Sequence, residues 1–93
     1  MSELRWTREA RTSLRDIYDF IARDRPTTAR RTIDSILARA ESLSEFPNLG
    51  QPFAYDPGVW VLSYGQFQIA YLPSRDRTTI LGVFHGLMFL PLD

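Results

Sequence analysis

Two stretches in the first half of the chain place apolar residues at the three- and four-residue spacing of amphipathic helices. The first follows Thr7, whose side chain can cap a helix N-terminus, and extends to about Asp24. Pro26 suits the first turn of a second helix, which ends before Phe46. The short connection predicts an antiparallel helical hairpin over residues 8–45. Its apolar positions are Ala10, Leu14, Ile17, Tyr18, Ile21, Ala29, Ile33, Ile36, Leu37, Ala40 and Leu43.

The remaining chain consists of short β-branched and aromatic runs separated by turn residues, a pattern typical of strands. One short strand is predicted before the helices, where Leu4 and Trp6 alternate with polar residues. The predicted fold is α+β: an N-terminal strand, then the helical hairpin packed on one face of an antiparallel sheet completed by a C-terminal three-stranded meander. The meander strands are predicted at 59–62, 67–72 and 78–84, with turns at 50–53, 56–58, Gly65 and 73–77.

The predicted sheet carries more apolar residues than one core requires. An antiparallel sheet with one wet face alternates apolar and polar residues, but residues 59–62 do not alternate and the segment 86–92 has no charge. A large exposed apolar patch on a small protein usually marks an interface. We therefore expect a partner to cover this face, and the alternative is that the C-terminal segment folds back over the sheet.

Length and charge limit the possible functions. Ninety-three residues make a single domain, 1–93. Cysteine is absent and His85 is the single histidine, so we expect no metal centre, no thiolate chemistry and no cofactor. Eleven arginines balance eleven acidic residues, which argues against direct binding to nucleic acid. No apolar run is long enough to span a membrane and the N-terminus is charged, so the expected location is cytoplasmic.

Three residues of the second half are candidates for polar contacts with a partner. His85 ends the last predicted strand, and Arg75 and Arg77 flank an acidic residue in a hairpin turn. Arginine can bind an acidic protein surface or a phosphate in this position. The alternatives are that His85 only fixes the strand end through a hydrogen bond and that the two arginines belong to a solvated turn.

Five short segments, in their order and spacing, carry a resemblance to a known superfamily. They are Trp6-Thr7 with Ala10, Ile17-Tyr18-Asp19-Phe20-Ile21-Ala22-Arg23-Asp24, Arg25-Pro26-Thr27-Thr28-Ala29, Ser44-Glu45-Phe46-Pro47-Asn48-Leu49-Gly50 and Ile80-Leu81-Gly82-Val83-Phe84-His85-Gly86. Together with the predicted order of elements, they make the chain similar to the RelE/ParE toxin superfamily over nearly its whole length. The resemblance is greater to the ParE branch.

The resemblance implies the toxin of a bacterial type II toxin–antitoxin module, bound in a hetero-oligomer by a cognate, ParD-like antitoxin from an adjacent gene. ParE-like members are associated with poisoning DNA gyrase, and we expect this chain to act by binding gyrase, with no catalytic residues of its own. His85, Arg75 and Arg77 would then contact the target. The residues expected to contact the antitoxin are Trp60, Leu62, Tyr71, Phe84, Leu87, Met88 and Phe89. For Trp60 and Tyr71, the alternative is a place in the hydrophobic core.

Two alternatives remain open. RelE-like members cleave mRNA on the ribosome, which requires cations and a general acid or base around the phosphate. The chain has no lysine and only two arginines after residue 39, so the candidates for this role would be Arg75, Arg77, His85 and Tyr71. The other alternative is a degenerate member that retains only antitoxin binding, because positions where the family often has cations are neutral here: Trp60, Gln68 and Met88.

Overall fold

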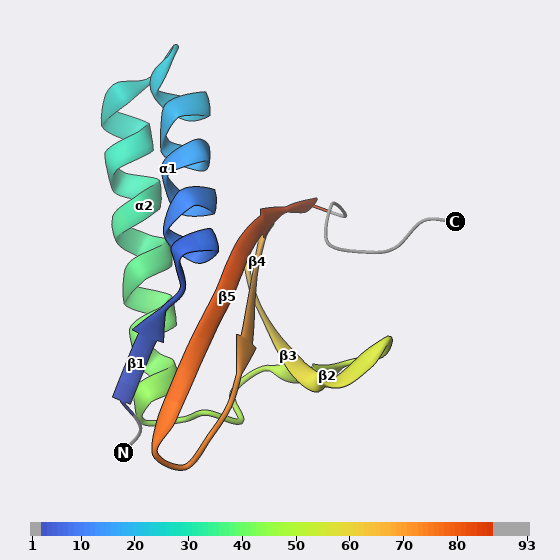
Figure 1. Ribbon diagram of the computed structural model, residues 1–93. Coiled ribbons are helices and arrows are strands. Elements are labelled where there is room, and N and C mark those ends of the chain that lie inside the picture. The colour runs from blue at the N-terminus through green and yellow to red at the C-terminus, as the bar shows by residue number, and fades with distance from the viewer. Residues whose placement is uncertain (1–2, 87–93) are drawn as a thin grey trace.

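The computed structural model describes residues 3–86, which form two α-helices against one face of a five-stranded sheet (Figure 1). The strand order in the sheet is β1-β5-β4-β3-β2. The predicted α+β architecture, with a helical hairpin on one face of the sheet, is confirmed. The elements are β1 (Glu3–Trp6), α1 (Arg8–Ala22), α2 (Pro26–Glu41), the 3₁₀ helix η1 (Ser42–Ser44), β2 (Gln51–Phe53), β3 (Asp56–Tyr64), β4 (Phe67–Leu72) and β5 (Arg77–His85).

The helical hairpin forms where the apolar spacing predicts it. Thr7 caps α1, since its side-chain oxygen accepts a hydrogen bond from the Ala10 backbone N–H at 3.0 Å. Pro26 starts α2 at the position where its missing N–H has no helical partner. Both helices are shorter than predicted: α1 ends at Ala22, and the last turn of the second predicted helix tightens into η1.

The sheet differs from the predicted one in three places. β1 pairs with β5 in parallel, so the sheet is mixed. The segment predicted as a turn at 50–53 contains β2, which pairs with β3 through Gln51 opposite Val61 and Pro52 opposite Trp60. A proline lacks a backbone donor but is tolerated in an edge strand, where no further strand needs that donor. The second predicted turn, at 56–58, is the beginning of β3.

The helix α1 completes the outer edge of β5 beyond the end of β1. The backbone N–H of Thr7 donates to the carbonyl of Ile80 at 3.2 Å, and the Thr7 hydroxyl lies 3.4 Å from the carbonyl of Leu81. Further along, the backbone N–H of Val83 donates to the hydroxyl of Ser13 at 2.9 Å. These contacts fix the angle between the hairpin and the sheet and satisfy an edge that would otherwise be open.

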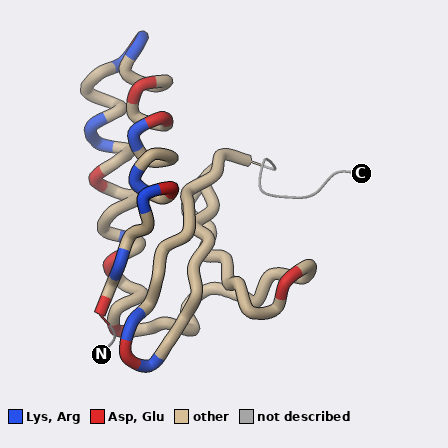
Figure 2. The backbone as a smooth tube through the Cα atoms, in the orientation of Figure 1, with Lys and Arg blue, Asp and Glu red and all other residues tan. Residues whose placement is uncertain are grey.

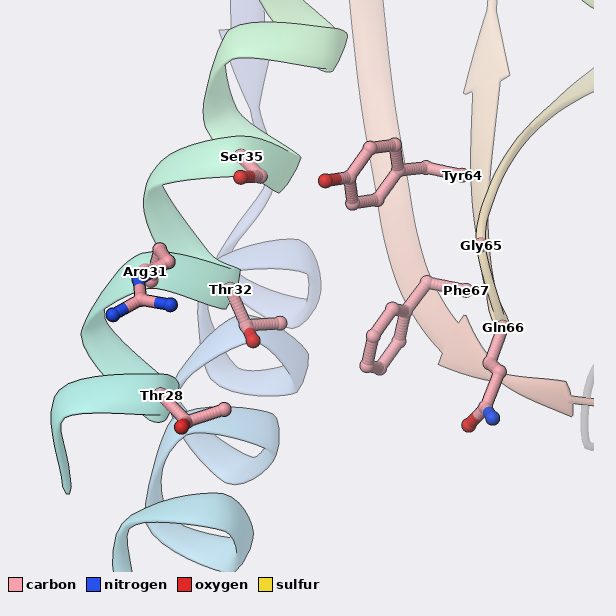
Figure 3. A pocket seen from close by; sticks show the side chains of 8 residues that line it. All are labelled: Thr28, Arg31, Thr32, Ser35, Tyr64, Gly65, Gln66 and Phe67. Carbon is pink, nitrogen blue, oxygen red and sulfur yellow. The ribbon is translucent and has the colours of Figure 1, made fainter. Parts of the chain in front are cut away.

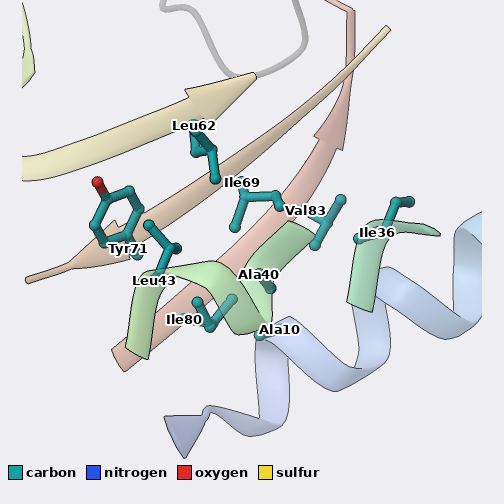
Figure 4. Close-up of a cluster of buried hydrophobic side chains, with 9 residues drawn as sticks. All are labelled: Ala10, Ile36, Ala40, Leu43, Leu62, Ile69, Tyr71, Ile80 and Val83. Carbon is teal, nitrogen blue, oxygen red and sulfur yellow. The ribbon is translucent and has the colours of Figure 1, made fainter. Parts of the chain in front are cut away.

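The hydrophobic core lies between the hairpin and the helix-facing side of the sheet (Figure 4). Side chains of β3, β4 and β5 that lie side by side in the register point into it, including Leu62 opposite Ile69 and Ile69 opposite Val83. The buried cluster consists of Ala10, Ile36, Ala40, Leu43, Leu62, Ile69, Tyr71, Ile80 and Val83.

Among residues 3–86, no helix lies on the opposite face of the sheet. Because side chains alternate along a strand, the register places Val61, Ala70 and Gly82 in one row of this face. Ser63 and Gln68 lie in the next row together with Phe84. Polar residues therefore interrupt this face, which is less apolar than the sequence pattern indicated, and most of the uncharged segment 86–92 lies outside the described residues.

Candidate functional site

His85 ends β5 and connects it to the turn between β3 and β4. Its Nε2 atom lies 2.8 Å from Oε1 of Gln66, and its ring centroid lies 5.3 Å from that of Phe67. The next residue, Gly86, has a φ of 62° and donates its backbone N–H to the carbonyl of Gln66 at 2.6 Å. Glycine adopts this positive φ without the strain that a side chain would add. His85 is therefore both an exposed ring and part of the bonding that fixes the strand end.

Arg75 and Arg77 lie at the other end of β5. The strand runs from Arg77 to His85, a length of about 26 Å at about 3.3 Å per residue. The Nε atom of Arg77 donates to Oε1 of Glu3 at 2.9 Å, which joins β5 to β1, whereas Arg75 is exposed in the turn before β5. The structure does not bring the three predicted target-binding residues into one site.

Two of the residues predicted to contact an antitoxin are buried beneath the helices. Leu62 is 3% exposed and Tyr71 is 0% exposed. Trp60 is half-buried on the same side of the sheet, and its ring centroid lies 6.4 Å from that of Tyr71. Leu62 and Tyr71 have no free surface to offer a partner, so the structure assigns them to the core and corrects the prediction. The uniformly apolar run 59–62 hid which side each residue faces.

Tyr71 also anchors the loop that precedes β2. Its hydroxyl donates to the carbonyl of Pro47 at 2.8 Å and accepts from the backbone N–H of Gly50 at 3.0 Å. Burial raises the pKa of Tyr71 above the ordinary value of 10.0, and the hydrogen bond from Gly50 opposes this in part. Tyr71 is thus a neutral structural phenol, and its enclosed hydroxyl does not fit the ribonuclease role considered from the sequence.

We expect the free energy of unfolding to fall as the pH rises above about 10, the ordinary pKa of tyrosine. The phenol of Tyr71 ionises more readily in the unfolded chain than in the fold. Its contribution is therefore complete below pH 10 and is lost as the pH rises through the raised pKa of the folded state. Urea unfolding at pH 8 and at several values above pH 10 measures this loss. Tyr71→Phe should show a smaller decline, and equal declines in both proteins would contradict the assignment.

Phe84 is the predicted antitoxin contact that the described residues place on the helix-free face. It lies opposite Gln68, and its ring stands over Gly82, where an added Cβ would come within 2.9 Å of two ring atoms. The bare glycine backbone is what allows the ring to lie against the strand. The other predicted contacts, Leu87, Met88 and Phe89, lie outside the described residues.

A hollow of about 410 Å³ opens between α2 and the β3–β4 turn (Figure 3). Thr28 and Thr32 point into it from α2, and the rings of Tyr64 and Phe67 point back toward the helix (Figure 3). Arg31 lies at the rim, with its guanidinium on the outer side of the helix. The hollow is lined by Thr28, Arg31, Thr32, Ser35, Tyr64, Gly65, Gln66 and Phe67.

The hydrophobic periodicity of the sequence does not mark the residues of this hollow. Thr28, Thr32 and Ser35 follow one another at spacings of four and three, which places them on one side of α2. This row of short hydroxyl side chains, next to the buried apolar row of the same helix, is the feature of the sequence that could have indicated the hollow. Longer side chains at these positions would have closed the gap to the sheet.

Charged residues are concentrated on the helices, and the sheet beyond β1 carries few of them (Figure 2). Within residues 3–86, no group of three or more histidine, cysteine, aspartate or glutamate residues could hold a metal ion. No helix in this part of the chain is long and apolar enough to cross a membrane. The structure thus offers a hollow, a sheet surface with few charges and separate polar contact points.

The chain is similar to two solved toxin–antitoxin structures. One is the chromosomal ParDE TA system from P. aeruginosa, with a TM-score of 0.80 and 25% identity over 92% of this chain and 97% of that chain. The other is the toxin-antitoxin complex RelBE2 from Mycobacterium tuberculosis, with a TM-score of 0.72 and 21% identity over 90% of this chain and 96% of that chain, a likeness of fold alone. No curated protein matches the chain.

A family model matches nearly the whole sequence. It is described as the ParE toxin of the type II toxin-antitoxin system, parDE, and it matches residues 4–88. The matched region covers every helix and strand described above except Glu3, the first residue of β1. The chain therefore belongs to the ParE family of type II toxin–antitoxin toxins.

Proposed function

We propose that this chain arrests bacterial growth by binding DNA gyrase in the cytoplasm, and that a cognate, ParD-like antitoxin neutralises it in a hetero-oligomer. The observation that carries the proposal is the ParE family match over residues 4–88. The likeness to the ParDE system supports an antitoxin as the partner. Gyrase as the target is inferred from the resemblance to ParE toxins, since the family match and the two similar structures name no target.

The distribution of charge supports action by binding. Cleavage of RNA requires cations and a proton-transferring group around one phosphate. The two arginines after residue 39 lie at one end of β5 and His85 at the other, about 26 Å apart at about 3.3 Å per residue. Arg77 is also held by Glu3. A toxin with this arrangement would act by occupying a surface of its target.

The proposed contact points follow from exposure. His85 and the adjoining β3–β4 turn present one surface, and Arg75 presents a separate one at the other end of the sheet. Phe84 and the half-buried Trp60 remain proposed antitoxin contacts, together with Leu87, Met88 and Phe89. The toxin would therefore contact its partners through several separate surfaces, as expected of a protein that acts by binding.

Induced expression in a bacterium that carries a DNA-damage reporter tests the proposal. We expect growth arrest with a strong reporter signal, because a poisoned gyrase leaves broken DNA, and restored growth when the adjacent small reading frame is co-expressed. A vector with a stop codon at Trp6 is the matched control. Arrest without the reporter signal would favour a translation inhibitor of the RelE type. No arrest, with folded protein present, would identify a member that retains antitoxin binding alone.

A further inference from the structure

β1 is an edge strand of the sheet, and no other strand among residues 3–86 pairs with its outer side (Figure 1). The backbone N–H groups of Glu3 and Thr7 donate toward β5, to the carbonyls of residues 76 and 80. Because neighbouring residues of a strand direct these groups to opposite sides, the N–H and C=O of Leu4 point away from β5. Those of Trp6 do so too, but Nη1 of Arg11 donates to its carbonyl at 2.9 Å. The open part of the edge is therefore centred on Leu4.

The opposite edge of the sheet is protected against pairing with another chain. There, β2 has three residues and its central residue is Pro52, which has no backbone N–H to donate. A proline in a short edge strand is a usual protection of this kind. β1 contains no proline, and its two charged residues, Glu3 and Arg5, have opposite signs (Figure 2). The outer side of β1 is thus the edge that can accept a further strand.

The two charged side chains of β1 lie on the helix-free face of the sheet. Leu4 and Trp6 pack against the core on the other face, so the residues that alternate with them point away from the helices. Arg5 is exposed and forms no ion pair within residues 3–86. Glu3 accepts from Nε of Arg77 at 2.9 Å. A carboxylate has about four acceptor sites, so Glu3 can accept from a second arginine while it holds the first.

We propose that two copies of this chain pair antiparallel through β1, with Leu4 opposite the partner's Leu4. These two residues would exchange N–H and C=O groups in two hydrogen bonds. Glu3 of each copy would lie opposite the partner's Arg5, so that two ion pairs flank the centre. The two-fold axis is perpendicular to the sheet, which keeps both helical hairpins on one side and joins two five-stranded sheets into one.

The charges of β1 favour this register over the neighbouring ones. A two-fold axis through an antiparallel pair places one residue opposite its own copy. An axis at Glu3 would set two carboxylates opposite each other, and an axis at Arg5 would do the same with two guanidinium groups. Like charges directly opposite destabilise a strand pair. An axis at Trp6 would need the carbonyl that Arg11 already occupies. Leu4 is therefore the position about which the strand is complementary to itself.

The proposed contact is small, because β1 has four residues. Stable interfaces usually bury more than about 1,200 Å² in total, so we expect a weak dimer whose population rises with protein concentration. Each substitution acts twice in this dimer, since both copies carry it. The inference depends on neither the proposed target nor the proposed antitoxin.

Sedimentation velocity of the purified full chain over a series of concentrations tests the inference. The wild type should shift from the 10.8 kDa monomer toward a species of twice that mass. Arg5→Glu replaces two opposite-charge pairs with two like-charge pairs, and it should weaken self-association by about tenfold or more. Arg23→Glu, the same change of charge at the far end of α1, is the matched control and should alter self-association by less than about threefold.

Mixing two variants locates the contact. Glu3→Arg and Arg5→Glu should each stay monomeric alone, whereas an equimolar mixture should form a heterodimer, because every cross-strand pair then again has opposite charges. A folded wild type that stays monomeric at every concentration would overturn the inference. So would self-association of Arg5→Glu as strong as that of the wild type, or a mixture of the two folded variants that stays monomeric. Because Arg5 forms no ion pair, its variant remains informative if Glu3→Arg does not fold.

Discussion

Gly50→Ala is expected to lower the free energy of unfolding by about 2–4 kcal/mol. A Cβ at Gly50 would lie 2.3 Å from the carbonyl oxygen of Val61 and 2.9 Å from the hydroxyl of Tyr71. The Val61 carbonyl belongs to the backbone of β3, so it cannot move without disturbing the sheet. The Tyr71 hydroxyl is held by Pro47 and by Gly50 itself. The methyl group must therefore break one of these attachments.

Urea unfolding at neutral pH measures the effect, with Gly58→Ala as the matched control. An added Cβ at Gly58 meets its nearest neighbour, an oxygen of Asp56, at 3.5 Å, which is ordinary contact. We expect this control to stay within about 1 kcal/mol of the wild type. Equal stability of the two variants would show that the loop before β2 does not depend on the close approach of Gly50.

Ile36→Ala should be at least as damaging, with a loss of about 2–5 kcal/mol. Ile36 is 0% exposed in the cluster between α2 and the sheet, and its removal leaves a cavity that the surrounding helices and strands cannot close. A domain of this size has a total stability of about 5–15 kcal/mol, so the variant could lose half of it. Both the core and the wall of the hollow on α2 would be loosened.

The neighbouring residue provides the control for this second prediction. Leu37 is 39% exposed on the same helix, so Leu37→Ala should cost less than about 1 kcal/mol. Thermal unfolding of the two variants at equal concentration compares them directly. Similar melting temperatures would mean that α2 does not pack through Ile36 as the structure indicates.

The sequence was most informative about the helical hairpin. Apolar residues recur through two long stripes, and Thr7 and Pro26 mark the two helix starts by their backbone chemistry. The helix ends were less well predicted, because η1 continues the apolar pattern in a tighter form that periodicity does not distinguish. Local residue chemistry therefore predicted where the two helices begin better than where they end.

The sequence was less informative about the pairing of the strands and about which face of the sheet each strand residue occupies. Nothing local distinguishes parallel from antiparallel pairing of β1, which depends on contact with β5 at the far end of the chain. The apolar run 59–62 gave no alternation, so Leu62 was assigned to a partner interface although it is buried in the core. β2 was missed because its Pro52 is typical of turns, and an edge strand tolerates proline.

The candidate site could be predicted only in part, because it too depends on contacts between distant parts of the chain. His85, Arg75 and Arg77 were selected by residue type, but the length of β5 separates them. The hollow joins α2 to the β3–β4 turn, which lie about 30 residues apart in the chain, so its shape is a tertiary property. Only the hydroxyl stripe of Thr28, Thr32 and Ser35 was present locally.

A supercoiling assay with purified DNA gyrase tests the proposed function most directly. The folded chain is added alone, and in parallel after incubation with an excess of the antitoxin from the adjacent reading frame. The account predicts that the chain alone inhibits supercoiling and leaves cleaved DNA, and that the antitoxin restores the reaction. Gyrase that supercoils normally in the presence of the folded chain, at concentrations that arrest growth, would contradict it.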